Sequence, residues 1–302
     1  MYPILLQLDI FGYPLRFYSY GTMLSLSFVV SIVIALKLVR RDGYPKNFSI
    51  NTFIMAIVGS LVGARILYVL TNLDDFSDGF PLSILDFKNR DGMVAYGGYL
   101  GGIIISWWYL SRRGLSLFRF GDGVAPLLAL GLGFTRIGCL LAGCDYGKPT
   151  DLPIGISFPK GSFAYSRHLR ERLITAGNEW SLPVFPTQPA ESLTGFLLFG
   201  ILLWFHIRKR KHAGQTLALF LFLYGVARFL IEFARGDEGR GGVGFFSTSQ
   251  WIALITAAFA VWIYFKRFPI TEEKTLAAIR LAEEREEKKK SASPFAGGKK
   301  KK

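Results

Sequence analysis

The sequence predicts an all-α integral membrane protein with seven transmembrane helices and an extracytoplasmic insert between helices four and five. Hydrophobic residues make up 51% of the 302 residues. They gather in runs of about 20 residues, the length that crosses a hydrocarbon core of about 30 Å. A soluble domain would carry shorter apolar stretches that charges interrupt. Basic residues cluster in alternate connections between the runs, which is typical of loops that stay in the cytoplasm.

The expected spans follow one another along most of the chain. They are residues 17–39, 51–71, 93–110, 121–143, 190–207, 214–234 and 246–265. Hydropathy supports the second and fourth spans least, because the second contains Arg65 and the fourth is rich in glycine. Residues 1–16 lack the basic segment and cleavage site of a signal peptide. We expect them to form an extracytoplasmic arm at the membrane interface.

Charge in the connections sets the expected orientation. The connections after the first, third, fifth and seventh spans are basic: Arg40, Arg41 and Lys46; Arg112 and Arg113; residues 208–211; Lys266 and Arg267. The connection after the second span is acidic: Asp74, Asp75, Asp78, Asp86 and Asp91. Because short cytoplasmic loops carry the excess of Lys and Arg, we expect the amino terminus outside and the carboxyl terminus inside.

Two segments lie outside the expected membrane domain of residues 17–265. Residues 144–189 are too long for a structureless connection, so we expect a small folded extracytoplasmic cap or a functional segment. The tail, residues 266–302, holds twelve Lys or Arg within a chain of net charge +14. A solvated cytoplasmic tail beside an anionic leaflet explains it. Nucleic-acid binding is disfavoured, since no aromatic residues are interleaved with these charges.

Three arginines fall inside expected spans, where charges are costly and usually functional. Arg65, Arg136 and Arg228 each lie five to seven residues from the outer end of a span, or about 10 Å deep at 1.5 Å per residue. They could share one site for an anion. Alternatively, each side chain could reach the headgroups separately.

The sixth span carries a polar stripe. Tyr224, Arg228, Glu232 and Arg235 are spaced i, i+4, i+8 and i+11, which places them on one helical face. The stripe could be an internal ion pair that fixes packing, or a carboxylate that positions an arginine toward an anionic ligand. Arginine suits a phosphodiester because its planar fork offers two donors to two oxygens.

Several chemistries find no support in the sequence. There is no P-loop, no catalytic carboxylate pair, no Ser-His-Asp arrangement and no metal or cofactor motif. The three histidines lie in the insert or near the cytoplasmic basic loop, away from the arginines: His168, His206 and His212. Glycine pairs such as Gly59/Gly63 and Gly97/Gly98 allow close helix packing, or the close approach of a ligand.

At these residues the chain resembles the prolipoprotein diacylglyceryl transferase family over residues 18–250. The matching pieces occur in the family order: Tyr18-Ser19-Tyr20-Gly21, Gly63-Ala64-Arg65, Asp91-Gly92-Met93-Val94-Ala95-Tyr96-Gly97-Gly98, Arg136-Ile137-Gly138, Pro186-Thr187-Gln188 followed by Glu191, and Tyr224-Gly225-Val226-Ala227-Arg228-Phe229-Leu230-Ile231-Glu232-Phe233. The chain departs from the family at Tyr96, which stands for a histidine, and at Cys139 and Cys144, which stand for an asparagine and a glutamate.

The resemblance implies a bacterial inner-membrane enzyme without a cofactor, its amino terminus periplasmic. Such an enzyme moves the diacylglyceryl group of phosphatidylglycerol to the lipobox cysteine thiol of a preprolipoprotein and releases glycerol phosphate. The implied partners are phosphatidylglycerol, the lipobox segment and membrane lipids, with no nucleic acid. A transporter or flippase of anionic lipids is the alternative, because it would also need intramembrane arginines and broken helices. A purely structural scaffold ranks third, since buried arginines argue against it.

Roles follow for the matching residues. Arg136 and Arg228 would clamp the phosphate, which leaves as charge develops on it, and Glu232 would orient Arg228. The expected substrate-binding residues are Tyr20, Arg65, Gly97, Gly98, Gly138, Tyr224, Arg235 and Gln188. Tyr96 would either handle the thiol proton or only position the headgroup while water takes the proton.

Three readings stay open for Cys139 and Cys144. They could be small packing residues, a disulfide or, least favoured, a covalent nucleophile. A spacing of i, i+5 is poor disulfide geometry within one regular helix.

Overall fold

The computed structural model describes residues 4–10, 13–76, 92–236 and 242–292. The predicted acidic residues Asp78, Asp86 and Asp91 and the terminal lysines 299–302 lie outside these ranges. The chain divides into two compact units, which are described separately. The first combines Met1–Ala35 with Gly121–Pro269, and the second combines Leu36–Phe120 with Ile270–Lys302.

Each predicted span coincides with a helix. Among the described residues, six helices are long and apolar enough to cross a membrane: α1 (Ser19–Arg41), α2 (Lys46–Thr71), α4 (Leu117–Ala142), α6 (Thr187–Arg208), α7 (Gln215–Glu232) and α8 (Thr248–Lys266). The predicted third span corresponds to α3 (Ala95–Ser111), which has 17 residues and rises about 25 Å. The protein is therefore a mainly helical, multi-pass membrane protein, and a seventh span stays a prediction.

The amino-terminal arm is a β-hairpin, which the all-α expectation missed. Strand β1 (Ile4–Ile10) pairs antiparallel with β2 (Tyr13–Tyr18), so α1 begins two residues later than predicted. A second short hairpin, β3 (Gly242–Val243) with β4 (Phe246–Ser247), leads into α8. Ser247 then caps α8 in a reciprocal capping box with Gln250, which fixes the start of that helix.

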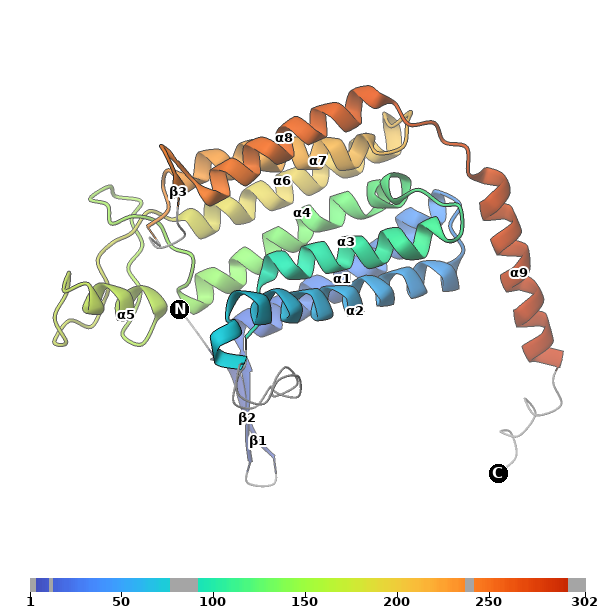
Figure 1. Ribbon diagram of the computed structural model, residues 1–302. Helices are drawn as coiled ribbons and strands as arrows, with labels where there is room; N and C mark the ends of the chain where they lie inside the picture. Colours follow the sequence, from blue (N-terminus) through green and yellow to red (C-terminus); the bar gives the residue numbers. More distant parts are fainter. Residues whose placement is uncertain (1–3, 11–12, 77–91, 237–241, 293–302) are drawn as a thin grey trace. The chain divides into compact units, whose positions relative to one another are not determined.

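The first unit has its core where α4, α6 and α7 meet. The fully buried members of this core are Ala125, Ala129, Leu198, Leu202 and Phe220. Small residues allow the close approach: a Cβ on Gly195 of α6 would lie 2.5 Å from the backbone nitrogen of Gly133 on α4. Helix α7 also packs along α8, and these helices run side by side in Figure 1.

The second unit is built on the α2–α3 pair. Glycines face one another across it: a Cβ on Gly63 would lie 2.3 Å from the carbonyl oxygen of Gly97, and one on Gly59 would lie 2.6 Å from that of Gly101. The two helix backbones therefore touch, which is the packing role that the glycine pattern predicts. A role of Gly97 and Gly98 in binding a ligand stays a prediction.

The predicted insert contains a short helix, α5 (Phe163–Arg170), and its own hydrophobic cluster. That cluster consists of Tyr146, Phe158, Ala164 and Val184. Backbone bridges such as Ile156–Val184 close the segment upon itself. It is thus a folded part of the first unit, and its side of the membrane stays a prediction.

The basic tail is not wholly solvated, which corrects the expectation for its first half. Helix α9 (Glu273–Ala292) buries Leu276 to 2% exposure. Glu283 accepts hydrogen bonds from the backbone N–H groups of Asn47 (3.3 Å) and Phe48 (2.7 Å) in the first turn of α2. The residue before α2, Pro45, makes no side-chain cap, so a glutamate 235 residues away caps that helix.

We predict that Glu283→Ala lowers thermal stability, because loss of a cap costs about 1 kcal/mol. For a protein of this size the melting temperature in detergent should fall by about 2–4 °C. The control is Glu284→Ala, which alters an exposed neighbour and should change little. Equal melting temperatures for the two variants would refute the capping role.

Candidate active site

Two arginines and two carboxylates form a closed ring of ion pairs in the first unit. Arg136 contacts Asp145 (Nη1–Oδ2, 2.5 Å) and Glu191 (Nε–Oε2, 2.6 Å). Arg235 contacts Asp145 (Nη2–Oδ1, 2.7 Å) and Glu191 (Nη1–Oε1, 3.0 Å). Each carboxylate therefore joins both guanidinium groups, and the charges of the ring cancel.

A glycine turn brings Asp145 back to Arg136. Helix α4 ends at Ala142, and Gly143 follows in the left-handed region with φ of 77°. The N–H groups of Gly143 and Cys144 both donate to the carbonyl of Cys139 (2.8 and 3.1 Å), which is the usual glycine termination of a helix. The chain reverses, so a carboxylate nine residues after Arg136 faces its guanidinium.

Two further helix ends supply the rest of the ring. Glu191 lies in the second turn of α6, and Arg235 follows the end of α7. Arg235 is held there by a backbone bridge to Gly147, which belongs to the segment after α4. The ring therefore ties the ends of α4, α6 and α7 together.

Burial distinguishes the two carboxylates. The side chains of Glu191 and Arg235 are 2% and 3% exposed, whereas Arg136 is 14% and Asp145 is 29% exposed. Burial would raise the pKa of Asp145, but the charges of Arg136 and Arg235 outweigh it and lower the pKa from 3.8 to about 2. The stabilisation from this carboxylate is thus present above its ordinary pKa and is lost only as the pH falls through the lowered one.

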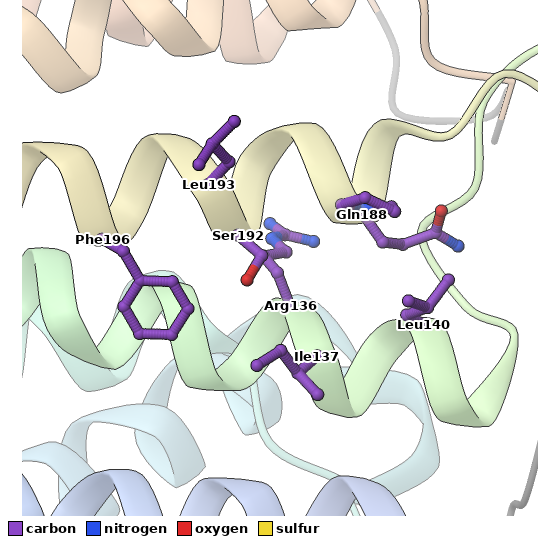
Figure 2. Close-up of a pocket in the computed structure, with 8 residues that line it drawn as sticks. Arg136, Ile137, Leu140, Gln188, Ser192, Leu193 and Phe196 are labelled. Carbon is purple, nitrogen blue, oxygen red and sulfur yellow. The ribbon is translucent and has the colours of Figure 1, made fainter. Parts of the chain in front are cut away.

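A cavity of about 320 Å³ lies beside Arg136, between α4 and α6. Its walls are mostly apolar: Ile137, Leu140, Pro189, Leu193 and Phe196. Figure 2 shows the Arg136 side chain extending from α4 toward Ser192 and Gln188 of α6. A guanidinium group at an apolar cavity suits a molecule with an anionic group and hydrocarbon chains.

Gln188 lines this cavity and is 1% exposed. Its Nε2 donates to the carbonyl of Cys144 (2.9 Å). Its Oε1 has no hydrogen-bond partner among the described residues. The predicted substrate-binding residue therefore sits at the cavity with an unused acceptor.

The second arginine pair lies on α7. Arg228 and Glu232 form an ion pair (Nη2–Oε2, 2.7 Å), with side chains 11% and 9% exposed. Ser247 donates to the other carboxylate oxygen of Glu232 (2.7 Å). Nη1 of Arg228 is buried and makes no hydrogen bond within the described part of the chain. This arrangement agrees with a carboxylate that positions an arginine.

The predicted stripe is wrong for Arg235. Helix α7 ends at Glu232, so the helical period no longer applies three residues later, and Arg235 joins the ring instead. Tyr224 remains on α7 and stacks on Phe220 with ring centroids 5.6 Å apart. It packs against the hydrophobic core of the unit.

Tyr20 and Gly138 mark a close approach of α1 and α4. A Cβ on Gly138 would lie 3.2 Å from Cα of Tyr20. Tyr20 is close enough to Arg136 and Asp145 to interact with their charges, and its side chain is partly exposed. Tyr20, Gly138 and Gln188 therefore belong to the same unit as the ring, and their role in binding the substrate stays a prediction.

The remaining predicted residues belong to the second unit. Arg65 is buried, donates to the carbonyl of Gly92 (3.2 Å) and lies over the rings of Tyr68 and Phe76 (5.5 and 5.3 Å). Protein groups hold the Arg65 guanidinium group. The alternative in which this side chain reaches the lipid headgroups separately is therefore wrong for Arg65. Tyr96 is half-exposed near the start of α3, and its role stays a prediction.

Two members of the ring were missed as site residues. Glu191 carries a signal that could have found it, because a carboxylate at the start of an apolar span needs a partner. Asp145 carries a weaker signal: it closely follows a glycine that ends a span. Neither position reveals its partner without the fold.

The fold and the ring define a multi-pass membrane protein with guanidinium groups fixed beside an apolar cavity. A sequence profile described as prolipoprotein diacylglyceryl transferase matches residues 4–266. The chain belongs to this family.

Curated relatives support this family assignment. A phosphatidylglycerol–prolipoprotein diacylglyceryl transferase of Clostridium tetani is 36% identical over 264 residues, covering 87% of this chain and 97% of the relative. Proteins named for the same activity in Clostridium perfringens (36% identical; 85% and 92% covered) and Bordetella avium (32%; 83% and 89%) are similar over comparable lengths. These relatives and the apolar helices identify a multi-pass bacterial membrane protein.

We predict that Glu191→Gln strongly destabilises the protein. The substitution removes one buried anion and leaves two buried guanidinium groups short of a partner, which typically costs about 3–5 kcal/mol. Thermal unfolding in detergent and the yield of folded protein measure the loss.

The matched control is Glu171→Gln, which removes the carboxylate of an exposed ion pair with Arg167. Exposed pairs contribute at most about 1 kcal/mol. Similar melting temperatures for the two variants would contradict a central role of the ring.

Proposed function

We propose that this protein transfers the diacylglyceryl group of phosphatidylglycerol to the lipobox cysteine of preprolipoproteins in the bacterial inner membrane. The thiolate sulfur attacks the glyceryl carbon that bears the phosphate. A carbon–sulfur bond forms, the carbon–oxygen bond breaks, and glycerol phosphate leaves with the bonding electrons. Family membership supports this reaction, and the arginine ring beside an apolar cavity is the observation that carries it.

The ring is neutral as it stands, so a phosphodiester can bind both arginines only by replacing a carboxylate. Glu191 is almost fully buried inside the unit, whereas Asp145 is 29% exposed and lies in the turn after α4. Asp145 is therefore the exchangeable anion. A phosphodiester resembles it, since both offer two oxygens that share one negative charge.

The exchange would leave two guanidinium groups directed at the phosphate. Asp145 occupies Nη1 of Arg136 and Nη2 of Arg235, and both donors would pass to phosphate oxygens. Glu191 would keep both arginines in place. As the carbon–oxygen bond breaks, the phosphate gains a second negative charge, so fixed cations stabilise the transition state more than the ground state.

Arg228 supplies a further donor on this proposal. Glu232 and Ser247 hold one side of its guanidinium in place. The buried Nη1 then serves an oxygen of the lipid or of the peptide. Tyr96 and Arg65 keep their predicted roles in this proposal. Tyr96 accepts the thiol proton or positions the headgroup, and Arg65 contributes to substrate binding.

The proposal includes a topology. Seven spans, with α3 among them, place the amino terminus and the insert on the periplasmic side and α9 in the cytoplasm. The basic residues of the alternate connections support this orientation. In this orientation the ring lies on the periplasmic side, where lipobox cysteines become accessible.

We predict that Arg228→Lys nearly abolishes transfer. Lysine keeps the charge but loses the planar fork, and removal of one fixed donor to a developing oxyanion costs about 100-fold or more. The assay measures glycerol phosphate released from phosphatidylglycerol vesicles with a lipobox peptide, and the gain in peptide mass.

The control is Arg167→Lys, which changes an arginine of the insert outside the ring. A folded Arg228→Lys protein with most of the wild-type rate would reduce Arg228 to a general cation. A folded wild-type protein that releases no glycerol phosphate under any condition would refute the proposed function itself.

We predict that Asp145→Asn lowers KM for phosphatidylglycerol, by about tenfold. The amide carries no charge, so it no longer competes with the phosphate for Arg136 and Arg235. A tenfold change corresponds to about 1.4 kcal/mol, the scale of one hydrogen bond to a charged group. A purely structural carboxylate would behave differently. Its loss would raise KM, because the arginines would no longer be held where they can bind the phosphate.

A further inference from the structure

We propose that Cys139 and Cys144 form a reversible disulfide, a modification site that alters how Asp145 is held in the ring. The two sulfur atoms and a carboxylate oxygen of Asp145 all lie within 4.8 Å of one another. Both cysteines are free thiols in the structure. The prolipoprotein reaction uses neither of them, since the acceptor thiol belongs to the substrate.

The end of α4 creates the pairing. In a continuous helix, side chains five residues apart point away from each other. Here the helix stops at Ala142, and the left-handed turn at Gly143 folds Cys144 back over Cys139. The sulfur of Cys144 lies 3.8 Å from the carbonyl oxygen of Cys139. A spacing of five residues disfavours a disulfide within a regular helix. The chain does not form a regular helix from Cys139 to Cys144, because α4 ends at Ala142.

The turn depends on glycine for two reasons. The positive φ at Gly143 disfavours any other residue. A Cβ there would also lie 2.9 Å from Cδ1 of Phe158 and from Cβ of Ser162. The insert therefore packs against the turn and holds the two cysteines in the same neighbourhood.

The two thiols differ in access, which sets an order of reaction. Cys139 is 2% exposed, whereas Cys144 is only partly buried. Interaction with the neighbouring Cys139 side chain lowers the pKa of the Cys144 thiol, although burial opposes this effect. Cys144 is thus the attacking thiol, since thiolate character and access govern exchange.

The oxidant is a disulfide, carried by a protein or by a small molecule. The Cys144 thiolate attacks one sulfur of it, and the other sulfur leaves as a thiolate that takes up the proton lost by Cys144. Cys139, once deprotonated, then attacks the Cys144 sulfur of the mixed disulfide and expels the second thiolate, which takes up the proton from Cys139. Two protein thiols are oxidised and one external disulfide is reduced to two thiols.

Closure of the disulfide would reach the ring directly. The Cys139 thiol donates to Oδ2 of Asp145 at 3.4 Å, and this donor disappears on oxidation. Cys144 precedes Asp145 in the chain, so tying its sulfur to α4 also moves the backbone that carries the carboxylate. Oxidation therefore weakens the hold on the exchangeable anion.

A metal ion is the competing use of the same atoms. It would need an oxygen of Asp145, and both carboxylate oxygens are already engaged by arginines. A disulfide needs only the two sulfurs. The geometry favours the disulfide for this reason.

The first test is chemical and independent of transfer. The full-length protein in detergent is incubated with glutathione disulfide or with dithiothreitol, and then treated with iodoacetamide. We expect the oxidised protein to lose the mass of two hydrogen atoms, to resist alkylation, and to recover both thiols with dithiothreitol. Cys139→Ser should instead retain one bound glutathione on Cys144, and Cys144→Ser should react far more slowly.

Thiols that stay free at every glutathione ratio would overturn the proposal. So would a zinc ion, added as its chloride, that binds stoichiometrically while both thiols remain reduced and protected. Free thiols in all variants while transfer proceeds normally would sink the disulfide and leave the proposed function standing.

The second test rests on the proposed function and asks whether the disulfide reaches Asp145. The oxidised wild-type protein should show a KM for phosphatidylglycerol several-fold lower than the reduced protein. The double variant Cys139→Ser/Cys144→Ser should not respond to glutathione disulfide. A disulfide that forms but leaves KM unchanged would overturn the coupling to Asp145, and a disulfide in a protein without transfer would count against the proposed function alone.

Discussion

Neutralisation of Arg136 and Arg235 is the constraint on which this end of the first unit depends. A buried guanidinium group without a partner is strongly destabilising, so the carboxylates of Glu191 and Asp145 have to be close to both arginines. These four groups can meet only if α4 and α7 end, and α6 begins, at defined residues. The ring thus joins the ends of α4 and α7 to the start of α6, and it anchors the insert through Arg235 and its bridge to Gly147.

The membrane helices could be predicted because their cause is local. About 20 apolar residues in a row leave a helix as the form that satisfies the backbone within a bilayer, and the predicted spans lie close to the observed helices. The amino-terminal hairpin had a local signal that the prediction of helices did not use, since residues 6–10 alternate apolar and polar side chains over the length of a strand. The cap that Glu283 gives to α2 depends on residues 235 apart, and no local pattern encodes it.

The charged residues of the candidate site could be predicted from the sequence, but most of their ion-pair partners could not. Arg136, Arg228 and Glu232 could be found because charges inside apolar spans are rare. The helical period paired Arg228 with Glu232 correctly and then failed for Arg235, because a period holds only while the helix continues. Asp145 depends on the turn after α4, where positive φ values at Gly143 (77°) and at Asp145 itself (56°) redirect the chain. Sequence spacing contains no information on that direction.

The unequal burial of the two carboxylates separates a site from a purely structural ion-pair network. If both were as buried as Glu191, no external anion could displace either one, and the ring would only stabilise the fold. If both were as exposed as Asp145, the arginines would lose their fixed positions whenever a lipid entered, and positioning is what makes cations effective toward a developing charge. One permanent and one exchangeable counterion meet both needs. The Cys139–Cys144 pair adjoins the exchangeable member, so a chemical change there acts on the part of the ring that can move.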